Sequence, residues 1–206
     1  MKRIAEVVTY VLLILIITSC SFQQKKLPVL GEREVIDGDT IYHTIADFSF
    51  VNQDSSIVTE KTFENKIYVS DFFFTSCRSI CPIMKTQMLR VYEATDGMND
   101  VLILSHTIDP DYDTVNLLRN FASKLGVSSD RWHFVTGVKD SIYSMAQASY
   151  YVPALEDENE PDGFIHSGAF LLVDKERRIR GKYDGTVAED VDRLIADIRR
   201  LRKEYE

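Results

Sequence analysis

The sequence predicts a three-layer α/β domain, in which helices cover both faces of a largely parallel β-sheet. Two observations predict this class. Apolar runs that suit strands buried on both faces alternate with segments whose apolar residues recur at helical spacing. The chain also has 206 residues, 45% of them hydrophobic, which is enough for one domain with a sizeable core.

The first strands are expected near the start of the domain. Residues 47–52 alternate apolar and polar side chains, as in an edge strand, and residues 57–58 can pair with them across a polar turn. Residues 66–74 are almost continuously apolar, which predicts a strand buried on both faces. Further buried strands are predicted at residues 101–108 and 132–135.

Helices are expected between and after these strands. Helical spacing of apolar residues predicts one helix over residues 82–94 and another over residues 114–125, begun by Asp113 and ended by Gly126. The remaining predicted elements are a helix at 139–149, a hairpin of strands 169–174 and 179–183, and a final amphipathic helix at 187–205.

Cys77 and Cys81 are the most informative residues in this pattern. They lie between a buried strand and the helix after it, so Cys81 falls in the first helical turn and Cys77 in the loop before it. The positive end of the helix dipole favours a thiolate at Cys77, and the four-residue spacing lets both sulfurs face one point. A dithiol at this junction refines the fold class to a thioredoxin-like three-layer α/β/α domain. We also expect an N-terminal β-hairpin extension to this domain.

The cysteine pair can close as a disulfide or hold a metal ion. A structural zinc site requires four ligands, whereas Cu(I) is soft and accepts two sulfurs and one nitrogen. Among the four histidines, His43, His106 and His133 are expected to have structural roles. His166 differs because it follows the acidic loop of residues 156–162 and begins a strand, where a thioredoxin keeps a proline beside its cysteines. An imidazole at that place is a candidate third ligand.

The amino terminus resembles a lipoprotein signal peptide over residues 1–19. A basic start precedes an eleven-residue apolar run, shorter than the roughly 20 residues that span a bilayer, and small residues come directly before Cys20. Lipidation of Cys20 would leave a membrane tether at residues 20–40 and a domain at residues 41–206, outside the cytoplasm on the periplasmic side of a bacterial cell envelope. The alternative is an uncleaved anchor, which places the domain on the same side.

The charge of the chain excludes one class of partner. The formal net charge is −8 at pH 7, and nucleic-acid phosphates require a basic face. An acidic surface is compatible with metal cations and with basic proteins, but it selects neither.

Five motifs in order resemble those of the Sco/SenC family, thioredoxin-fold proteins linked to the assembly of cytochrome c oxidase. The motifs are residues 43–48, 75–82, 107–114, 132–137 and 166–168. The resemblance covers most of the domain. It implies one bound copper ion, as Cu(I) or Cu(II), with Cys77, Cys81 and His166 as ligands. It also implies that the protein delivers copper to, or reduces thiols in, the dicopper site of cytochrome c oxidase subunit II.

Other functions of the dithiol stay open at this stage. A thiol–disulfide oxidoreductase would use Cys77 to attack a target disulfide and Cys81 to resolve the mixed disulfide. A peroxidase would need a cationic activator, for which Arg78 is the obvious residue. A purely structural disulfide would close a very short loop and add little stability. The leading expectation is a copper metallochaperone rather than a turnover enzyme.

Four carboxylates also need an interpretation. Asp113 or Thr114 is expected to cap the helix that follows, and for Asp109 a structural and a functional role are equally supported. Asp71 lies in a buried strand and requires a partner that the sequence does not identify. Asp162 either orients His166 or is a solvated carboxylate of the acidic loop.

Overall fold

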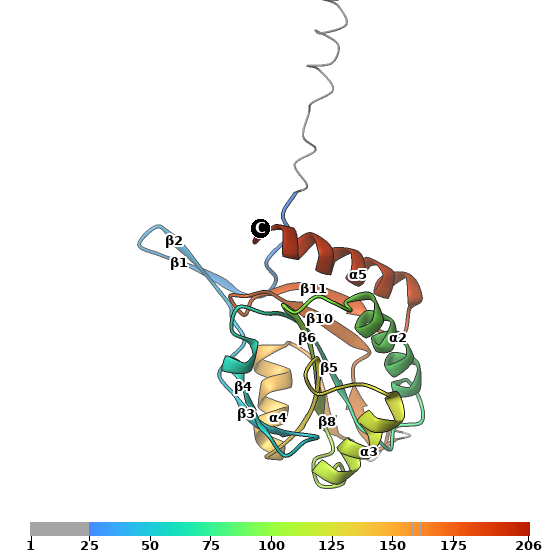
Figure 1. Cartoon of the computed structure of the whole chain (residues 1–206). Helices are drawn as coiled ribbons and strands as arrows, with labels where there is room; N and C mark the ends of the chain where they lie inside the picture. Colours follow the sequence, from blue (N-terminus) through green and yellow to red (C-terminus); the bar gives the residue numbers. More distant parts are fainter. Residues whose placement is uncertain (1–24, 158, 161) are drawn as a thin grey trace, which may run out of the picture.

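The computed structural model describes residues 25–157, 159–160 and 162–206, and it has the expected α/β architecture (Figure 1). The strands of the central sheet are β3 (Ser49–Asn52), β4 (Ile57–Thr59), β5 (Ile67–Phe73), β6 (Val101–Thr107), β7 (Trp132–Thr136), β10 (Ala169–Val173) and β11 (Ile179–Asp184). They lie in the order β11-β10-β5-β6-β7-β3-β4. Strands β5, β6 and β7 are parallel, and the outer strands pair antiparallel to their neighbours.

Helices cover both faces of this sheet (Figure 1). They are η1 (Glu60–Phe63), α2 (Cys81–Ala94), α3 (Val115–Leu125), α4 (Lys139–Ser144), η2 (Met145–Ser149) and α5 (Ala188–Lys203). Every residue of β5 is buried, and its side chains alternate between the faces. Phe73 packs against Phe121 of α3, whereas Phe72 packs against Tyr150, which follows η2. The thioredoxin-like three-layer class is therefore confirmed.

The predicted strands and helices are present, with one change of position in the sheet. Residues 47–52 were expected to form an edge strand, but β3 lies between β7 and β4. Val51 pairs with Thr136 on one side and with Ile57 on the other. The alternation of apolar and polar residues in β3 therefore indicates a strand with one exposed face, not an edge strand. The edge of the sheet on this side is β4.

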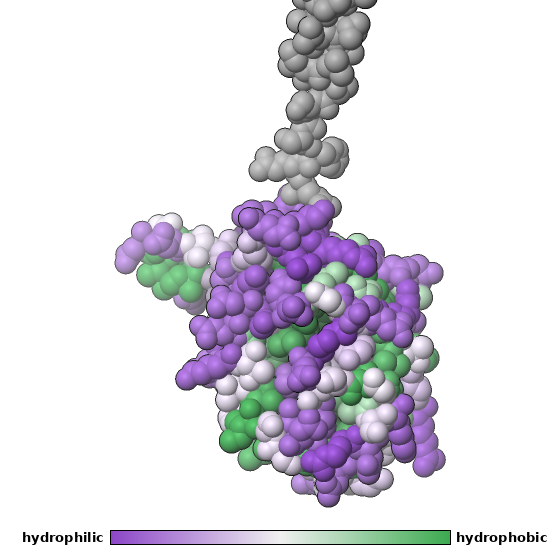
Figure 2. All heavy atoms as spheres, in the orientation of Figure 1, coloured by the Kyte–Doolittle hydropathy of each residue, from purple (hydrophilic) through white to green (hydrophobic). Residues whose placement is uncertain are grey.

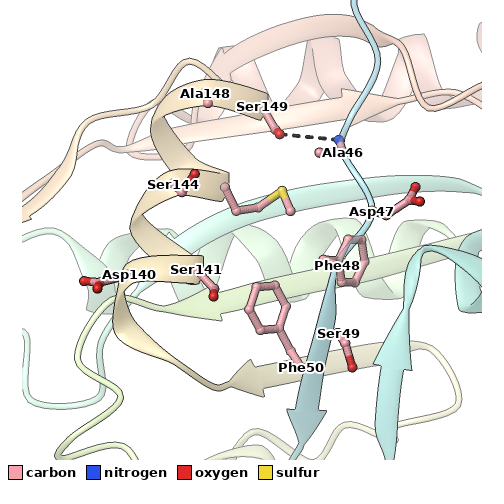
Figure 3. A pocket seen from close by; sticks show the side chains of 11 residues that line it. Ala46, Asp47, Phe48, Ser49, Phe50, Asp140, Ser141, Ser144, Ala148 and Ser149 are labelled. Atoms are coloured by element: carbon pink, nitrogen blue, oxygen red, sulfur yellow. Dashed lines mark hydrogen bonds between the residues drawn. The ribbon is translucent and has the colours of Figure 1, made fainter.

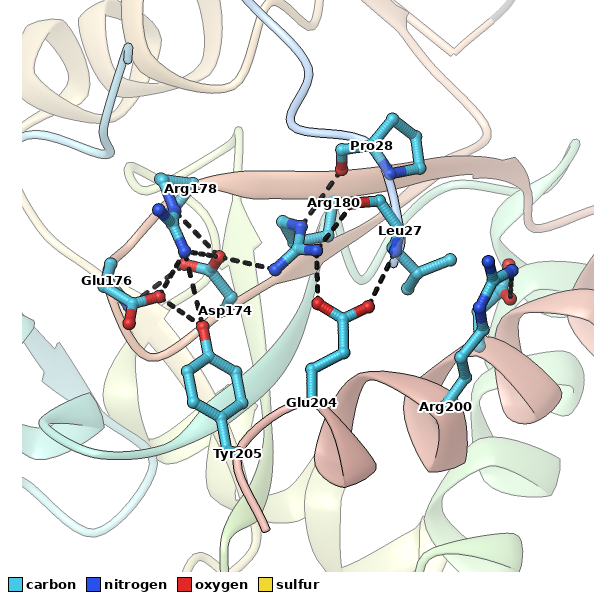
Figure 4. A network of polar contacts seen from close by, with 10 residues as sticks. Leu27, Pro28, Asp174, Glu176, Arg178, Arg180, Arg200, Glu204 and Tyr205 are labelled. Carbon is cyan, nitrogen blue, oxygen red and sulfur yellow. Dashed lines mark hydrogen bonds and ion pairs between the residues drawn. The ribbon is translucent and has the colours of Figure 1, made fainter. Parts of the chain in front are cut away.

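A network of charged side chains closes one end of the sheet (Figure 4). Arg180 of β11 is 4% exposed and donates to Asp174 at 3.0 Å and to Glu204 at 2.6 Å. The same guanidinium donates to the main-chain oxygens of Leu27 and Pro28. Glu204 also accepts from the Leu27 N–H at 2.7 Å. The first described residues and the last helix are thus fastened to the same buried arginine.

This network lies at the amino-terminal end of β5. Asp174 directly follows β10, whose Val173 pairs with Tyr68 at the start of β5. The cysteine-containing loop leaves the opposite, carboxyl end of β5. The point where the chain enters the domain and the start of α2, where the cysteines lie, are therefore at opposite ends of the sheet.

Part of the segment expected to be a tether has structure of its own. Strands β1 (Arg33–Ile36) and β2 (Asp39–Tyr42) form a hairpin that projects from the domain (Figure 1). Its turn is Asp37-Gly38, and both residues have positive φ angles of 53° and 90°, as a two-residue hairpin turn requires. Figure 2 shows exposed apolar surface on this hairpin, contributed by Val35, Ile36 and Ile41.

A second two-stranded sheet lies outside the central one. It consists of β8 (Ala154–Glu156) and β9 (Phe164–His166), which pair antiparallel. We call these two strands and the described residues between them the arm. The acidic loop predicted at residues 156–162 connects the two strands. Over the whole described part of the chain, no helix has the length and apolar character needed to cross a membrane.

Candidate metal centre

Cys77 and Cys81 lie between the end of β5 and the first turn of α2. We call residues 74–80 the dithiol loop. Helix α2 begins at Cys81, and Pro82 follows it, where the missing N–H costs nothing because the first helical N–H groups have no intrahelical partner. The Cys77 N–H bonds to the Phe74 carbonyl at 3.3 Å, which turns the loop back over the strand end. The predicted positions of both cysteines relative to the helix are confirmed.

The two thiols are in contact and largely shielded from water. Cys77 is 7% exposed and Cys81 is 4% exposed, and both are in the reduced form. A hydrogen bond with Cys77, together with burial, raises the pKa of the Cys81 thiol, although Lys85 one helical turn away acts in the opposite direction. Cys81 therefore holds its proton at neutral pH. A metal ion or disulfide formation has to displace that proton.

Asp113 holds the dithiol loop against the end of β6. It is fully buried and accepts from the Thr75 N–H at 3.0 Å and from the hydroxyls of Thr75 and Thr107. Of the two residues expected to cap α3, Thr114 does so by accepting from the Leu117 N–H, and the expectation that Asp113 begins the helix is wrong. The carboxylate is buried and satisfied by three donors, so it positions the loop instead.

Asp71 has the partner that its buried position requires. Its Oδ2 lies 2.6 Å from the Nζ of Lys85, and its Oδ1 accepts from the Ser105 hydroxyl. Lys85 is on α2 and Asp71 is on β5, so the ion pair joins the two elements that flank the dithiol loop. A buried charge is tolerated only when it is paired in this way.

The arm contacts the dithiol loop through Asp162. The Asp162 Oδ2 accepts from the Ser79 hydroxyl at 2.6 Å and from the Ser79 N–H at 3.2 Å, and it lies 3.7 Å from the Cys77 Sγ. The Ser79 hydroxyl lowers the pKa of the Asp162 carboxyl, so this group is ionised at neutral pH. Asp162 is therefore a surface carboxylate of the acidic loop that is also hydrogen-bonded to the dithiol loop.

Two further contacts bring the arm and the residues after it next to the dithiol loop. The ring centroids of Phe164 and Phe74 are 4.8 Å apart. A Cβ built on Gly168 would lie 3.9 Å from the Ile80 Cδ1. His166 lies between Phe164 and Gly168 in the chain, and its backbone belongs to β9. Residues on both sides of His166 therefore lie beside the dithiol loop.

Two of the residues singled out in the sequence fall outside the described side chains. These are Cys20 and the side chain of His166. Among the described side chains, no group of three or more cysteines, histidines and carboxylates is close enough to hold a metal ion. The third ligand that the sequence predicts for a metal ion at Cys77 and Cys81 is His166, whose side chain is not in that set.

The other three histidines have structural roles, as predicted. The His43 Nε2 lies 2.8 Å from the Ser149 carbonyl oxygen, and the His133 Nδ1 lies 3.3 Å from the Asn52 side-chain amide. His106 is fully buried in the core, where burial lowers its pKa to about 3. These imidazoles are thus engaged in bonds or packing of the domain.

A pocket of about 570 Å³ lies away from the cysteines, between β3 and α4 (Figure 3). Phe48, Phe50 and Met145 form its apolar wall, and Ser141 and Ser144 are among its polar lining residues. Neither cysteine nor histidine is among the residues that line it. The chemistry of this pocket is therefore unrelated to the dithiol.

Comparisons with known proteins agree with this geometry. The family model for SCO1/SenC matches residues 37–203. The SCO1 protein homolog of Bacillus subtilis (strain 168) is 29% identical over 199 residues, which is 96% of each chain.

Solved structures also share the fold. The structure of BsSco, described as a member of the Sco family of cytochrome c oxidase assembly proteins with a disulfide switch, has a TM-score of 0.70 and 28% identity. The match covers 85% of this chain and 96% of that one. Arabidopsis thaliana ScoI with copper bound has a TM-score of 0.63 and 24% identity, over 75% of this chain and 98% of that one. The present chain belongs to the SCO1/SenC family.

Proposed function

We propose that this protein binds one copper ion through Cys77, Cys81 and His166, and that copper is its cargo. The observation that carries the proposal is the approach of the arm to the dithiol loop. The two thiols are in contact, and residues on both sides of His166 lie next to the dithiol loop. Two sulfurs and one imidazole nitrogen suit Cu(I), which displaces the thiol protons when it binds.

The proposed acceptor is the dicopper site of cytochrome c oxidase subunit II. Family membership supports this choice, because BsSco is described as a member of a family of cytochrome c oxidase assembly proteins. A copper-bound relative of the same fold supports the metal. The buried pair Asp71–Lys85 and the carboxylate of Asp113 would keep the cysteines in place while the ion is transferred.

A titration tests the copper proposal. The full chain in detergent, reduced and kept free of oxygen, is titrated with Cu(I) in competition with a chromophoric chelator. One ion per chain is expected, with affinity lowered about 100-fold or more by Cys77→Ala or Cys81→Ala and clearly lowered by His166→Ala. His43→Ala is the matched control, because it removes an imidazole that bonds to the Ser149 carbonyl instead. Binding that is weak in the unmodified protein, or unaffected by His166→Ala, would refute the copper site.

A thiol–disulfide exchange function is the second candidate, favoured by the direct contact between the two thiols. The Cys77 thiolate would attack a target disulfide, form a mixed disulfide and release one target thiolate. Cys81 would then attack the Cys77 sulfur, close the Cys77–Cys81 disulfide and release the second target thiolate. Two electrons pass to the target, and a cellular dithiol reductant has to restore the pair. Under this function Cys77→Ser abolishes target reduction, whereas His166→Ala leaves it intact.

We also propose that lipidated Cys20 anchors the domain outside the cytoplasm. Leu27 is buried and bonded to Glu204, and about six residues separate Cys20 from Leu27, so a chain of this length spans at most about 25 Å. Membrane fractionation of bacterial cells is the test. Cys20→Ala should move the protein from the membrane to the soluble fraction without changing its copper binding.

A further inference from the structure

We propose that Asp162 is a positioning residue, which fixes the arm against the dithiol loop through Ser79 and thereby controls access to Cys77. The proposal deepens the proposed function and rests on it for the copper cargo, although the contact itself is made in the metal-free protein. In this proposal the partner of Asp162 is Ser79 in the dithiol loop. Asp162 would then orient His166 only indirectly, by setting the position of the arm that carries both residues.

The arm has a base that is attached elsewhere. The Gln147 side chain donates to the Ala154 carbonyl at 2.9 Å, and Lys139 forms an ion pair with Glu156 at 2.6 Å. Both contacts connect β8 to the α4–η2 segment on the far side of the sheet from α2. They hold the base of the arm whether or not its other end contacts the dithiol loop.

The far end of the arm is shaped to present Asp162. The Asp157 N–H bonds to the Gly163 carbonyl and the Gly163 N–H bonds to the Glu160 carbonyl, which folds this end back on itself. Gly163 has a φ of +80°, a conformation that glycine adopts without strain and that turns the chain from Asp162 into β9. This turn brings the carboxylate of Asp162 within hydrogen-bonding distance of Ser79, which lies midway between Cys77 and Cys81 in the sequence.

Ser79 couples this contact to Cys77. Its hydroxyl lies 2.6 Å from the Asp162 Oδ2 and 3.5 Å from the Cys77 Sγ, and the same carboxylate oxygen is 3.7 Å from that sulfur. Hydrogen bonds to an ionised carboxylate are about twice as strong as neutral ones. Losing the bond between Ser79 and Asp162 should let the end of the arm withdraw while its base stays in place. Cys77, now 7% exposed, would then become accessible.

Site-resolved alkylation of the metal-free, reduced full chain in detergent tests this inference. Iodoacetamide labelling of Cys77 is followed by mass spectrometry of its peptide. Asp162→Ala and Ser79→Ala should each raise the labelling rate about fivefold, the change expected for loss of roughly one hydrogen bond. Ser79→Thr keeps the hydroxyl and should restore the slow rate. Glu160→Ala removes the same charge from the same arm and should leave the rate within about twofold of the original.

The two serine variants separate position from charge. Removing the Asp162 carboxylate also favours the Cys77 thiolate, which by itself speeds alkylation. Ser79→Ala leaves that carboxylate in the chain, so a faster rate in Ser79→Ala that is reversed in Ser79→Thr supports the positioning role. A faster rate in Asp162→Ala alone, or in neither variant, would overturn it. Unfolding midpoints of all four variants establish that each is folded.

Copper release provides the second readout. Transfer of Cu(I) from the loaded protein to an excess of chelator should be faster in Asp162→Ala and Ser79→Ala by the same factor as alkylation, and unchanged in Glu160→Ala. If the unmodified protein holds no copper, the proposed function fails, and the alkylation rates still decide the role of Asp162. If it holds copper and all variants release it equally fast, the positioning role fails alone.

Discussion

The two ends of the central sheet are stabilised in different ways. At the amino-terminal end of β5, buried Arg180 is bonded to Asp174, Glu204 and two main-chain oxygens (Figure 4). At the carboxyl end, two reduced thiols share a hydrogen bond, and the arm reaches the loop between them through the exposed contact of Asp162 with Ser79.

One end of the sheet therefore mainly stabilises the fold, and the other end carries the reactive groups. Removing a group from the buried network leaves other buried charges without partners, which is costly. At the dithiol end, the two thiols can give up their protons to bind a metal ion or to form a disulfide. The dithiol loop and the arm hold these sulfurs near the surface. We therefore expect changes at the first end to affect folding and changes at the second to affect binding.

The largest effect is expected from Arg180→Ala. It removes one of the two arginine partners of buried Asp174 and the arginine partner of Glu204, and it should lower the free energy of unfolding by about 3–5 kcal/mol, as for other buried ion pairs broken on one side. Chemical denaturation measures the change. Arg178→Ala is the control, because Arg178 also pairs with Asp174 but is 25% exposed at the side chain, so its loss should cost about 1 kcal/mol or less. Copper affinity of the folded Arg180→Ala protein should be unchanged.

Acid should weaken the core beneath the dithiol end through His106. Burial lowers the folded pKa of His106 from 6.5 to about 3, so the unfolded chain binds the proton first as pH falls. Stability from this group is complete above pH 6.5 and declines as pH falls towards 3. Between pH 7 and pH 5 the loss should be about 2 kcal/mol.

Denaturation curves at several pH values check this expectation. His106→Phe keeps an aromatic ring against Phe72 and removes the titrating group, so its stability should change less between pH 7 and pH 5. An identical slope in both proteins would show that His106 does not carry the acid sensitivity.

The smallest effect on stability is expected at the cysteines. Cys77→Ser keeps a side chain that can hydrogen-bond to Cys81 and should change the free energy of unfolding by less than about 1 kcal/mol. Its Cu(I) affinity should nevertheless fall by the largest factor of any single variant. A Cys77→Ser protein that is strongly destabilised would remove the contrast between the two ends.

Much of this fold is predictable from local sequence. The apolar runs of β5 and β6 and the spacing in α2 follow from periodicities that survive in the structure. An N-terminal β-hairpin extension was expected, but its strands were not placed at residues 33–42, although Asp37-Gly38 is a strong hairpin signal. Residues 20–40 were interpreted as a membrane tether, so no strands were predicted there.

The parts of the site that could be predicted are those whose residues are close together in the sequence. Cys77 and Cys81 are identified by spacing and by their place between a strand and a helix. The roles of Lys85, Asp113 and Asp162 depend instead on how distant elements pack, and no periodicity encodes that. Asp71 showed that a partner was required, but which residue of α2 faces β5 is set by the rotation of the helix on the sheet.

The most direct test of the copper site is the absorption spectrum of the Cu(II)-loaded full chain in detergent. Thiolate ligation predicts a sulfur-to-copper charge-transfer band that is lost in Cys77→Ser and changed in His166→Ala. His43→Ala should leave the band unchanged. A band that is absent from the unmodified protein, or identical in His166→Ala, would contradict a centre built from Cys77, Cys81 and His166.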